Sequence, residues 1–251
     1  MRIALSVVFL LLVTQSVSGE DTKVFAAAAL RDPLVELAAQ YEAATGHKII
    51  LTFDTAGATE QKFREEPEAA FLVTTDTLIR EGERTGRLAK GTSFRLGDTV
   101  AGFAAPPGAA KPDISTPEKL RTALLSARRI AFSDPARGAT VGTHFMKVIE
   151  SLGVKDEVLR KATLARDGIE TMRLVLEENV DLGITQISEI LQASRDALVG
   201  PFPGEFDLAT TYTLWHGSDI SSAARGFVAL LTGPEGRQTI AESGLRAPAE
   251  Q

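Results

Sequence analysis

Cysteine is absent from the 251-residue sequence, which excludes disulfide bonds, thiolate nucleophiles and a lipid attached to an N-terminal cysteine. Histidine is scarce, and the three present, His47, His144 and His216, are too scattered to form the ligand set of a zinc site. Neither the phosphate-binding pattern Gly-x-x-x-x-Gly-Lys-Ser/Thr nor the Gly-x-Ser-x-Gly turn of hydrolases occurs. The sequence therefore predicts no bound metal and no cofactor.

Positive charge is also in short supply, with 27 Lys and Arg against 33 Asp and Glu and a formal net charge of −6. A surface of that sign repels a polyanion, which argues against nucleic acid as a partner. The longest apolar run, Ile3 to Val13, is too short to cross a bilayer as a helix. It follows Arg2 and precedes the small residues Val17-Ser18-Gly19, so we predict a cleavable signal peptide at residues 1–19 and export to the periplasm. A retained anchor is the alternative.

Strands alternate with helices along the rest of the chain, which predicts an α/β architecture rich in parallel strands. Two segments rich in proline and glycine, at residues 106–108 and 200–204, interrupt this pattern. Two interruptions suggest that the chain leaves its first lobe and later returns to it. We predict one lobe from residues 20–100 with 205–251, and a second lobe from residues 101–204.

Four turns lead directly into the start of a predicted helix, at Ala29–Asp32, Thr55–Ala58, Gly138–Val141 and Asp167–Ile169. The start of a helix presents unpaired N–H groups and about half a positive charge, which together form a seat for an anion. Small residues in the first of these turns allow a ligand to approach the backbone closely. If the four helix starts converge on a cleft between the lobes, they can hold a small anion.

Several motifs carry a resemblance to a known family. The segments occur in the order and at the spacings of periplasmic molybdate-binding proteins, and they read FAAAALRDPL, FDTAGATEQ, SDPARGATVGTHF, LGITQISEIL and SSAARGFVALLTGPEGRQTIAESGL. The resemblance covers essentially the whole mature chain. It implies a type II periplasmic binding protein fold, with two lobes that close by a hinge motion on a small anionic ligand. It also implies an inner-membrane ABC permease as a partner, and we expect a monomer.

The sequence departs from that family where the resemblance places its ligand-binding side chains. The two hydroxyl residues fall on Ala29 and Ala56, and the tyrosine falls on Gln186. We therefore expect a small organic polycarboxylate rather than molybdate, with Arg31 and Arg137 supplying guanidinium groups that match carboxylates. Thr185 is a further polar candidate. The expected ligand-binding residues are Ala29, Arg31, Thr55, Ala56, Gly57, Arg137, Thr140, Val141, Gly168, Ile169 and Gln186.

The variant motif TQISEI supports an alternative function, because it also resembles exported aconitate isomerases of the same fold. Moving the double bond of aconitate requires a base that removes a proton from one carbon and an acid that returns one to another. The candidates for these roles are His144, Asp134 and Glu189, which would be catalytic only in an isomerase. Spacing alone does not choose among them.

Overall fold

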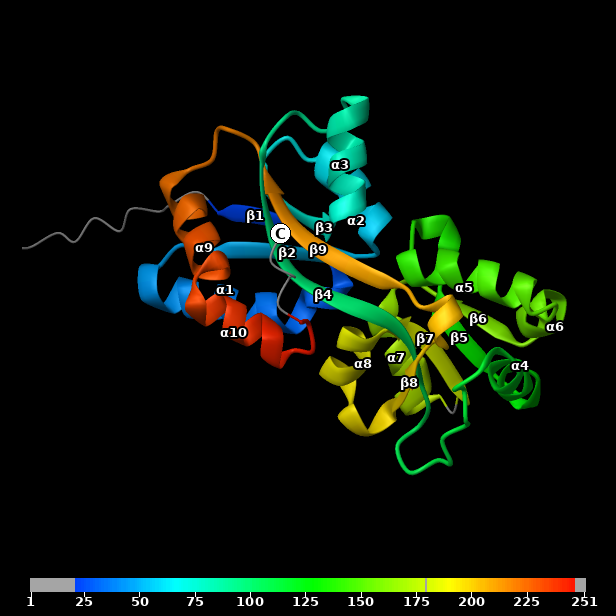
Figure 1. The fold of residues 1–251 in the computed structure, drawn as a ribbon. Helices are drawn as coiled ribbons and strands as arrows, with labels where there is room; N and C mark the ends of the chain where they lie inside the picture. Colours follow the sequence, from blue (N-terminus) through cyan, green and yellow to red (C-terminus); the bar gives the residue numbers. More distant parts are fainter. Residues whose placement is uncertain (1–20, 179, 247–251) are drawn as a thin grey trace, which may run out of the picture.

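The computed structural model describes residues 21–178 and 180–246, so the predicted signal peptide at residues 1–19 lies outside the described residues. Within that part, strands and helices alternate as the sequence predicts (Figure 1). The strands are β1 (Thr22–Ala27), β2 (Ile49–Asp54), β3 (Ala69–Thr75), β4 (Thr92–Ala104), β5 (Ile130–Ser133), β6 (Ala162–Ala165), β7 (Leu182–Gln186), β8 (Leu198–Pro201) and β9 (Ala209–His216).

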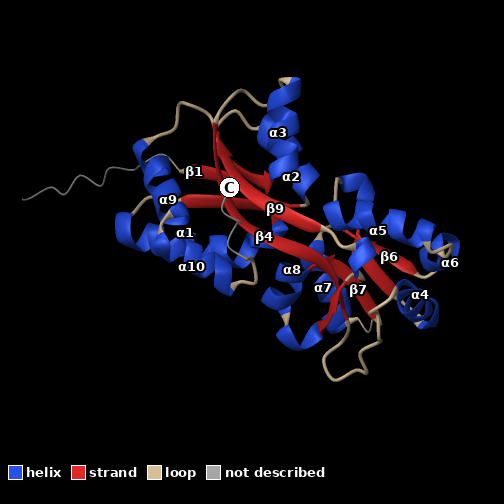
Figure 2. Ribbon diagram, viewed as in Figure 1, coloured by secondary structure: helices blue, strands red, loops and turns tan. Residues whose placement is uncertain are grey.

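The helices pack on the sheets of the two lobes (Figure 2). They are α1 (Arg31–Thr45), α2 (Ala56–Glu65), α3 (Asp76–Thr85), α4 (Pro117–Ser126), α5 (Thr140–Ser151), α6 (Lys155–Arg160), α7 (Gly168–Glu177), α8 (Ile187–Ala193), α9 (Ser222–Thr232) and α10 (Pro234–Glu242). Short 3-10 turns connect some of them, namely η1 (Ala28–Leu30), η2 (Pro135–Arg137), η3 (Arg195–Ala197) and η4 (Gly204–Phe206).

The strand order is β2-β1-β3-β9-β4-β7-β5-β6, with β8 beside β4. Each lobe has a parallel part, in which β1 lies between β2 and β3, and β5 lies between β6 and β7. All pairings of β4 and β9 are antiparallel. The prediction of a parallel-rich architecture is therefore right for the outer strands and wrong for the centre, where β4 and β9 run through the molecule.

Strand β4 changes partners part-way along its length. Residues Thr92 to Val100 pair with β9, and residues from Ala101 onward pair with β7 and β8. The chain crosses from one lobe to the other within this unbroken strand, and the proline-rich segment at residues 106–108 comes after it (Figure 1). The predicted lobe boundaries themselves stay a prediction.

The apolar interior is divided between the lobes. One cluster packs α1, α9 and α10 against β1 and β3, with Phe71 and Phe227 fully buried. A second cluster packs α4 and α5 against β4, β5 and β7, and contains the contacting rings of Phe132 and Phe145, whose centroids are 5.0 Å apart. Because each lobe has an interior of its own, the lobes can move relative to one another without exposing either interior.

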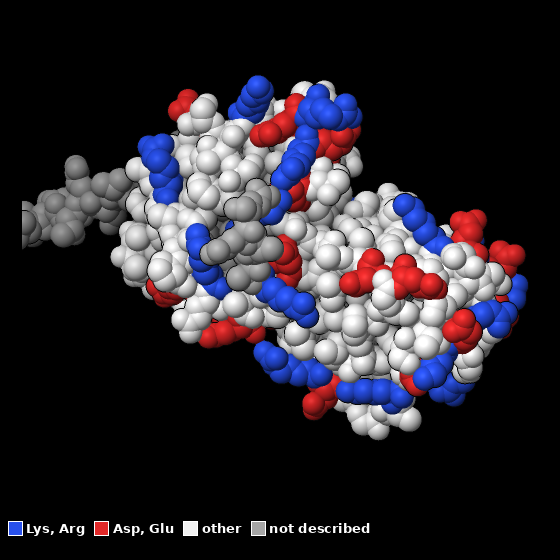
Figure 3. All heavy atoms as spheres, in the orientation of Figure 1, with Lys and Arg blue, Asp and Glu red and all other residues white. Residues whose placement is uncertain are grey.

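The surface carries charges of both signs. On the face shown in Figure 3, basic and acidic side chains are interspersed. Among the described residues, no helix is long and apolar enough to span a membrane.

Candidate functional site

A small pocket lies between the lobes, at the carboxyl ends of β1, β2, β5 and β7, which is where α/β sheets commonly bind ligands. It encloses about 30 Å³, so the two lobes are tightly closed around it. The lining residues are Ala27, Ala28, Ala29, Asp54, Thr55, Ala56, Ser133, Ala139, Thr140, Val141, Gly168, Thr185, Gln186, Glu189 and Tyr212.

The four turns singled out from the sequence all reach this pocket. The starts of η1 and α2 contribute from the first lobe, and the starts of α5 and α7 contribute from the second. The first N–H groups of a helix have no partner within the helix, so these starts supply donors for a negatively charged guest. Seven of the residues expected to bind the ligand line the pocket, namely Ala29, Thr55, Ala56, Thr140, Val141, Gly168 and Gln186.

Four of the expected residues do not line the pocket. Arg31 is exposed at the start of α1, and its guanidinium group pairs with the adjacent Asp32 at 3.0 Å. Gly57 donates its N–H to the carbonyl oxygen of Gly138 across the lobes at 3.1 Å. Ile169 lies one residue beyond the pocket lining. The expectation that Arg31 faces the cleft is therefore wrong, because its side chain is exposed at the surface and is not among the residues that line the pocket.

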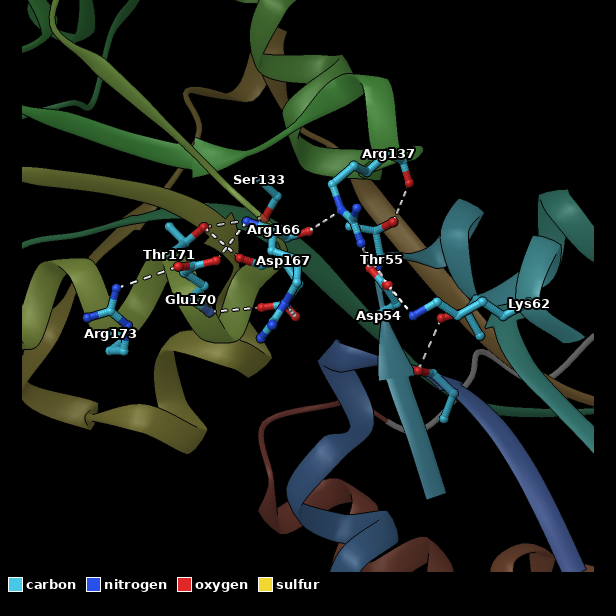
Figure 4. A network of polar contacts seen from close by, with 12 residues as sticks. Asp54, Thr55, Lys62, Ser133, Arg137, Arg166, Asp167, Glu170, Thr171 and Arg173 are labelled. Atoms are coloured by element: carbon cyan, nitrogen blue, oxygen red, sulfur yellow. Dashed lines mark hydrogen bonds and ion pairs between the residues drawn. The ribbon is translucent and has the colours of Figure 1, made fainter. Parts of the chain in front are cut away.

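Arg137 closes the rim of the pocket instead of offering a free guanidinium group to a ligand. Its Nη2 donates to both carboxylate oxygens of Asp54, at 2.9 and 2.8 Å, and thereby joins the second lobe to the first (Figure 4). The Thr55 hydroxyl donates to the Arg137 carbonyl oxygen beside this pair. The same Asp54 carboxylate accepts a bond from Lys62 at 2.7 Å, which lies within the first lobe.

Asp54 is only 2% exposed, yet it stays ionised. Burial disfavours the charge, but hydrogen bonds from Lys62, from the Thr55 N–H and from Arg137 outweigh burial and hold the pKa of Asp54 below its usual value. This carboxylate is therefore neutralised by its partners and forms a fixed contact between the lobes.

Glu189 is the second carboxyl group in the pocket, and its surroundings are different. It lies in the first turn of α8, where its Oε2 accepts a bond from the Thr185 hydroxyl and one from the Gln186 N–H, the latter at 3.1 Å. Burial raises the pKa of Glu189 to about 7, with the negative charge of Asp167 acting in the same direction and the two hydrogen bonds opposing it. Glu189 can therefore exchange a proton near neutral pH.

The other two candidates for acid–base chemistry lie outside the pocket. His144 places Nε2 2.8 Å from the carbonyl oxygen of Phe206, and its ring packs against Phe202. Asp134 accepts the N–H of Ala136 at 2.9 Å and thereby caps η2. Of the three candidates, the structure brings only Glu189 to the pocket.

Sequence reasoning did not find Tyr212, which lines the pocket from β9 and is 3% exposed. Burial raises the pKa of its phenol well above the ordinary value, so the phenol stays neutral. Gln186 lies beside it, with Nε2 3.0 Å from the hydroxyl of Thr210 and 3.4 Å from the hydroxyl of Tyr212. Within the described part of the chain, the Gln186 Oε1 is buried without a hydrogen-bond partner.

Comparison with known proteins places this architecture in a family. The family model for bacterial extracellular solute-binding proteins matches residues 22–246. The chain belongs to this family. Within the parts that the structure describes, this solute-binding protein has no group of three or more His, Cys, Asp or Glu side chains arranged to hold a metal ion.

Relatives of this solute-binding protein differ in what they do. An aconitate isomerase from a Pseudomonas species is 28% identical over 225 residues, which cover 84% of this chain and 82% of the relative. The periplasmic molybdate-binding protein of Azotobacter vinelandii has a TM-score of 0.72 and 20% identity over 91% of this chain and all of the other. PEB3 from Campylobacter jejuni has a TM-score of 0.64 and 14% identity, over 91% of this chain and all of the other, and PEB3 was also solved with bound L-phospholactate.

Proposed function

We propose that this exported protein binds a small organic polycarboxylate in the interlobe pocket and presents it to an ABC importer in the inner membrane. The helix starts provide backbone donors for carboxylate oxygens, and the pocket holds no positively charged side chain in its lining. The predicted signal peptide, the family membership and the two-lobed fold support a role outside the cytoplasm.

The observation that carries the proposal is that the pocket contains acceptors as well as donors. Glu189 presents a buried carboxyl group, and the amide of Gln186 lies beside it in the pocket lining. Molybdate is a dianion that presents only acceptor oxygens, so it would repel an ionised Glu189. The hydroxyl of a hydroxy acid can supply an O–H group, and the positions of Ala29 and Ala56 provide no hydroxyl donors for a tetrahedral oxyanion.

The ligand can be identified directly. Mass spectrometry of the small molecules that co-purify with the protein is expected to find a di- or tricarboxylic acid. Calorimetry with molybdate, tungstate, fumarate, citrate and trans-aconitate is expected to show binding of at least one of the organic acids and weaker binding of the oxyanions. Tight molybdate binding without carboxylate binding would overturn the proposal.

A second candidate function is isomerisation of aconitate, which is favoured by one observation. A carboxyl group with a pKa of about 7 lies in the pocket, and a relative with 28% identity is an aconitate isomerase. In this reaction Glu189 would take a proton from the CH₂ carbon of aconitate, the double bond would move toward that carbon, and a proton would return to the former alkene carbon. Incubation with trans-aconitate should then produce cis-aconitate, and E189Q should not. If the wild-type protein at high concentration converts no trans-aconitate, this candidate is eliminated.

Lobe closure should contribute to binding through Arg137. We expect R137Q to weaken binding of the identified acid by about tenfold, because it removes both bonds to Asp54 and favours the open state by about 1.4 kcal/mol. This value allows for solvent screening, since the Arg137 side chain is 37% exposed. K62Q is the matched control, because Lys62 pairs with the same carboxylate but within one lobe. Calorimetry should show little change in affinity for K62Q, and equal losses in the two variants would argue against the interlobe role.

A further inference from the structure

Glu189 is a buried acid inside a site that is built for anions, and it has no cationic partner. It is 8% exposed, and among the described residues it takes part in no ion pair. Both hydrogen bonds shown to its carboxyl group end on Oε2. A Cβ atom added to Gly168 would lie 2.0 Å from Oε2 and 2.2 Å from Oε1, so the group fits closely against the start of α7.

The elements packed around Glu189 bring no positively charged side chain into contact with it. The start of α7 contributes the carboxylate of Asp167, and the nearby Arg166 pairs with that carboxylate at 3.3 Å with its own side chain 64% exposed. Strand β9 contributes the neutral phenol of Tyr212, which lines the same pocket. Strand β7 contributes only the Thr185 hydroxyl and the groups of Gln186.

The remaining neighbours of α8 add no unpaired cation near Glu189. The start of α1, where the Asp32 N–H donates to Gln192 of α8, carries Arg31 and Asp32, which pair with each other at the surface. Strand β4 carries Asp98 next to Thr99, whose hydroxyl accepts the N–H of Ser188 in the first turn of α8. In η3, Arg195 and Asp196 are exposed, and Arg195 bonds to a backbone carbonyl of α10. Across the pocket, Asp54 is neutralised by its two cationic partners. An ionised Glu189 would therefore face an incoming anion with no positively charged side chain beside it.

We propose that the protein takes up its acidic ligand together with one proton, which Glu189 carries on its carboxyl group. A protonated Glu189 is neutral and has an O–H that can donate to a ligand carboxylate, so a repulsive contact becomes a hydrogen bond. This inference rests on the proposed function, because it requires an anionic ligand in this pocket. It makes Glu189 the residue that couples binding to pH.

The direction in which pH changes the affinity follows from the proton on Glu189. In the free protein the pKa of Glu189 is about 7, and the negative charge of a bound ligand raises it further. Well below pH 7, Glu189 holds its proton in both the free and the ligand-bound protein, so the affinity for the ligand is independent of pH. Above pH 7 the free protein must take up a proton on binding, so the dissociation constant is expected to rise by up to tenfold for each pH unit.

The experiment measures the affinity of the full mature protein for trans-aconitate between pH 6 and 9. The carboxyl groups of this probe are ionised above about pH 7, so they do not contribute to the dependence above that pH. Calorimetry in buffers of different ionisation enthalpy counts the protons taken up, which we expect to approach one per ligand at pH 8.5. E189Q should bind with an affinity that does not vary with pH.

A matched control is E60Q, because Glu60 is equally buried at 7% exposure but lies outside the pocket and pairs with Arg87. E60Q is expected to keep the pH dependence of the wild-type protein. Binding with no proton uptake, or an unchanged slope in E189Q, overturns the coupling and leaves the proposed function standing. If none of the organic acids binds, the proposed function and the coupling fail together. If E189Q does not bind at all, proton counting on the wild-type protein still decides the question.

Discussion

Replacing Gly57 with valine is expected to weaken ligand binding by roughly a hundredfold while leaving the ligand-free protein folded. Gly57 lies in the first turn of α2, and a Cβ atom there would lie 2.8 Å from the Cα of Gly138 in the opposite lobe. These are backbone atoms that cannot rotate away, so the lobes must stay apart. The ligand would then lose the donors of one lobe, and each hydrogen bond to a charged group contributes about 1.5–3 kcal/mol. Calorimetry with the identified acid measures the loss.

Substitutions at Gly57 are expected to weaken ligand binding without lowering the stability of the ligand-free protein. Glycine is an unfavourable residue within a helix, so replacing Gly57 with alanine should hold or raise the stability of the first lobe by up to about 1 kcal/mol. We expect G57A and G57V to melt at or above the wild-type temperature in the absence of ligand and to bind more weakly, with the larger side chain having the larger effect. G204A is the control, because no atom lies within 4 Å of the added Cβ. If G57V binds as tightly as G204A, the close approach of the lobes does not matter for binding.

The strand–helix corners could be predicted from the sequence because their determinants are local. The small residues after β1 and the threonine that caps α2 specify the turns directly, and the Thr55 hydroxyl accepts the N–H of Ala58 as such a cap does. Each of these strand–helix corners follows the carboxyl end of a strand, and the carboxyl ends of these strands face the pocket. Local signals therefore predict the helix starts that reach the pocket, whereas Glu189 is predicted only as one of three candidate catalytic residues of the alternative isomerase.

The pairing of charged side chains could not be predicted, because it depends on groups far apart in the chain. Arg137 meets Asp54 across 83 residues, whereas Arg31 meets its immediate neighbour Asp32. Nothing in the sequence around either arginine distinguishes the two cases. Tyr212 was missed for a related reason, since it reaches the pocket only because β9 pairs antiparallel with both β3 and β4. The short elements α6, β6 and β8 have too few residues to show a periodic pattern.

Replacing Gly168 with alanine is expected to reduce binding by at least a hundredfold, because the added methyl group takes the space of the Glu189 carboxyl group. The added Cβ would lie about 2 Å from both carboxyl oxygens, far inside van der Waals contact. To relieve this overlap, the carboxyl group must leave the Thr185 hydroxyl and the Gln186 N–H. Its displacement leaves the buried Thr185 hydroxyl and Gln186 N–H without this acceptor at the wall of the pocket in which the ligand binds.

Combining G168A with a substitution at Glu189 tests whether the Glu189 carboxyl group is the cause of the weakened binding. In E189A the obstructing carboxyl group is gone, so adding G168A should have little further effect on binding or on melting temperature, although G168A alone is severe. Such strong non-additivity is the signature of two residues in direct contact. G217A serves as the control glycine, because its Cβ would meet no atom within 4 Å. If G168A is equally severe with and without Glu189, the loss comes from the backbone at the start of α7, and the carboxyl group is not what the methyl group displaces.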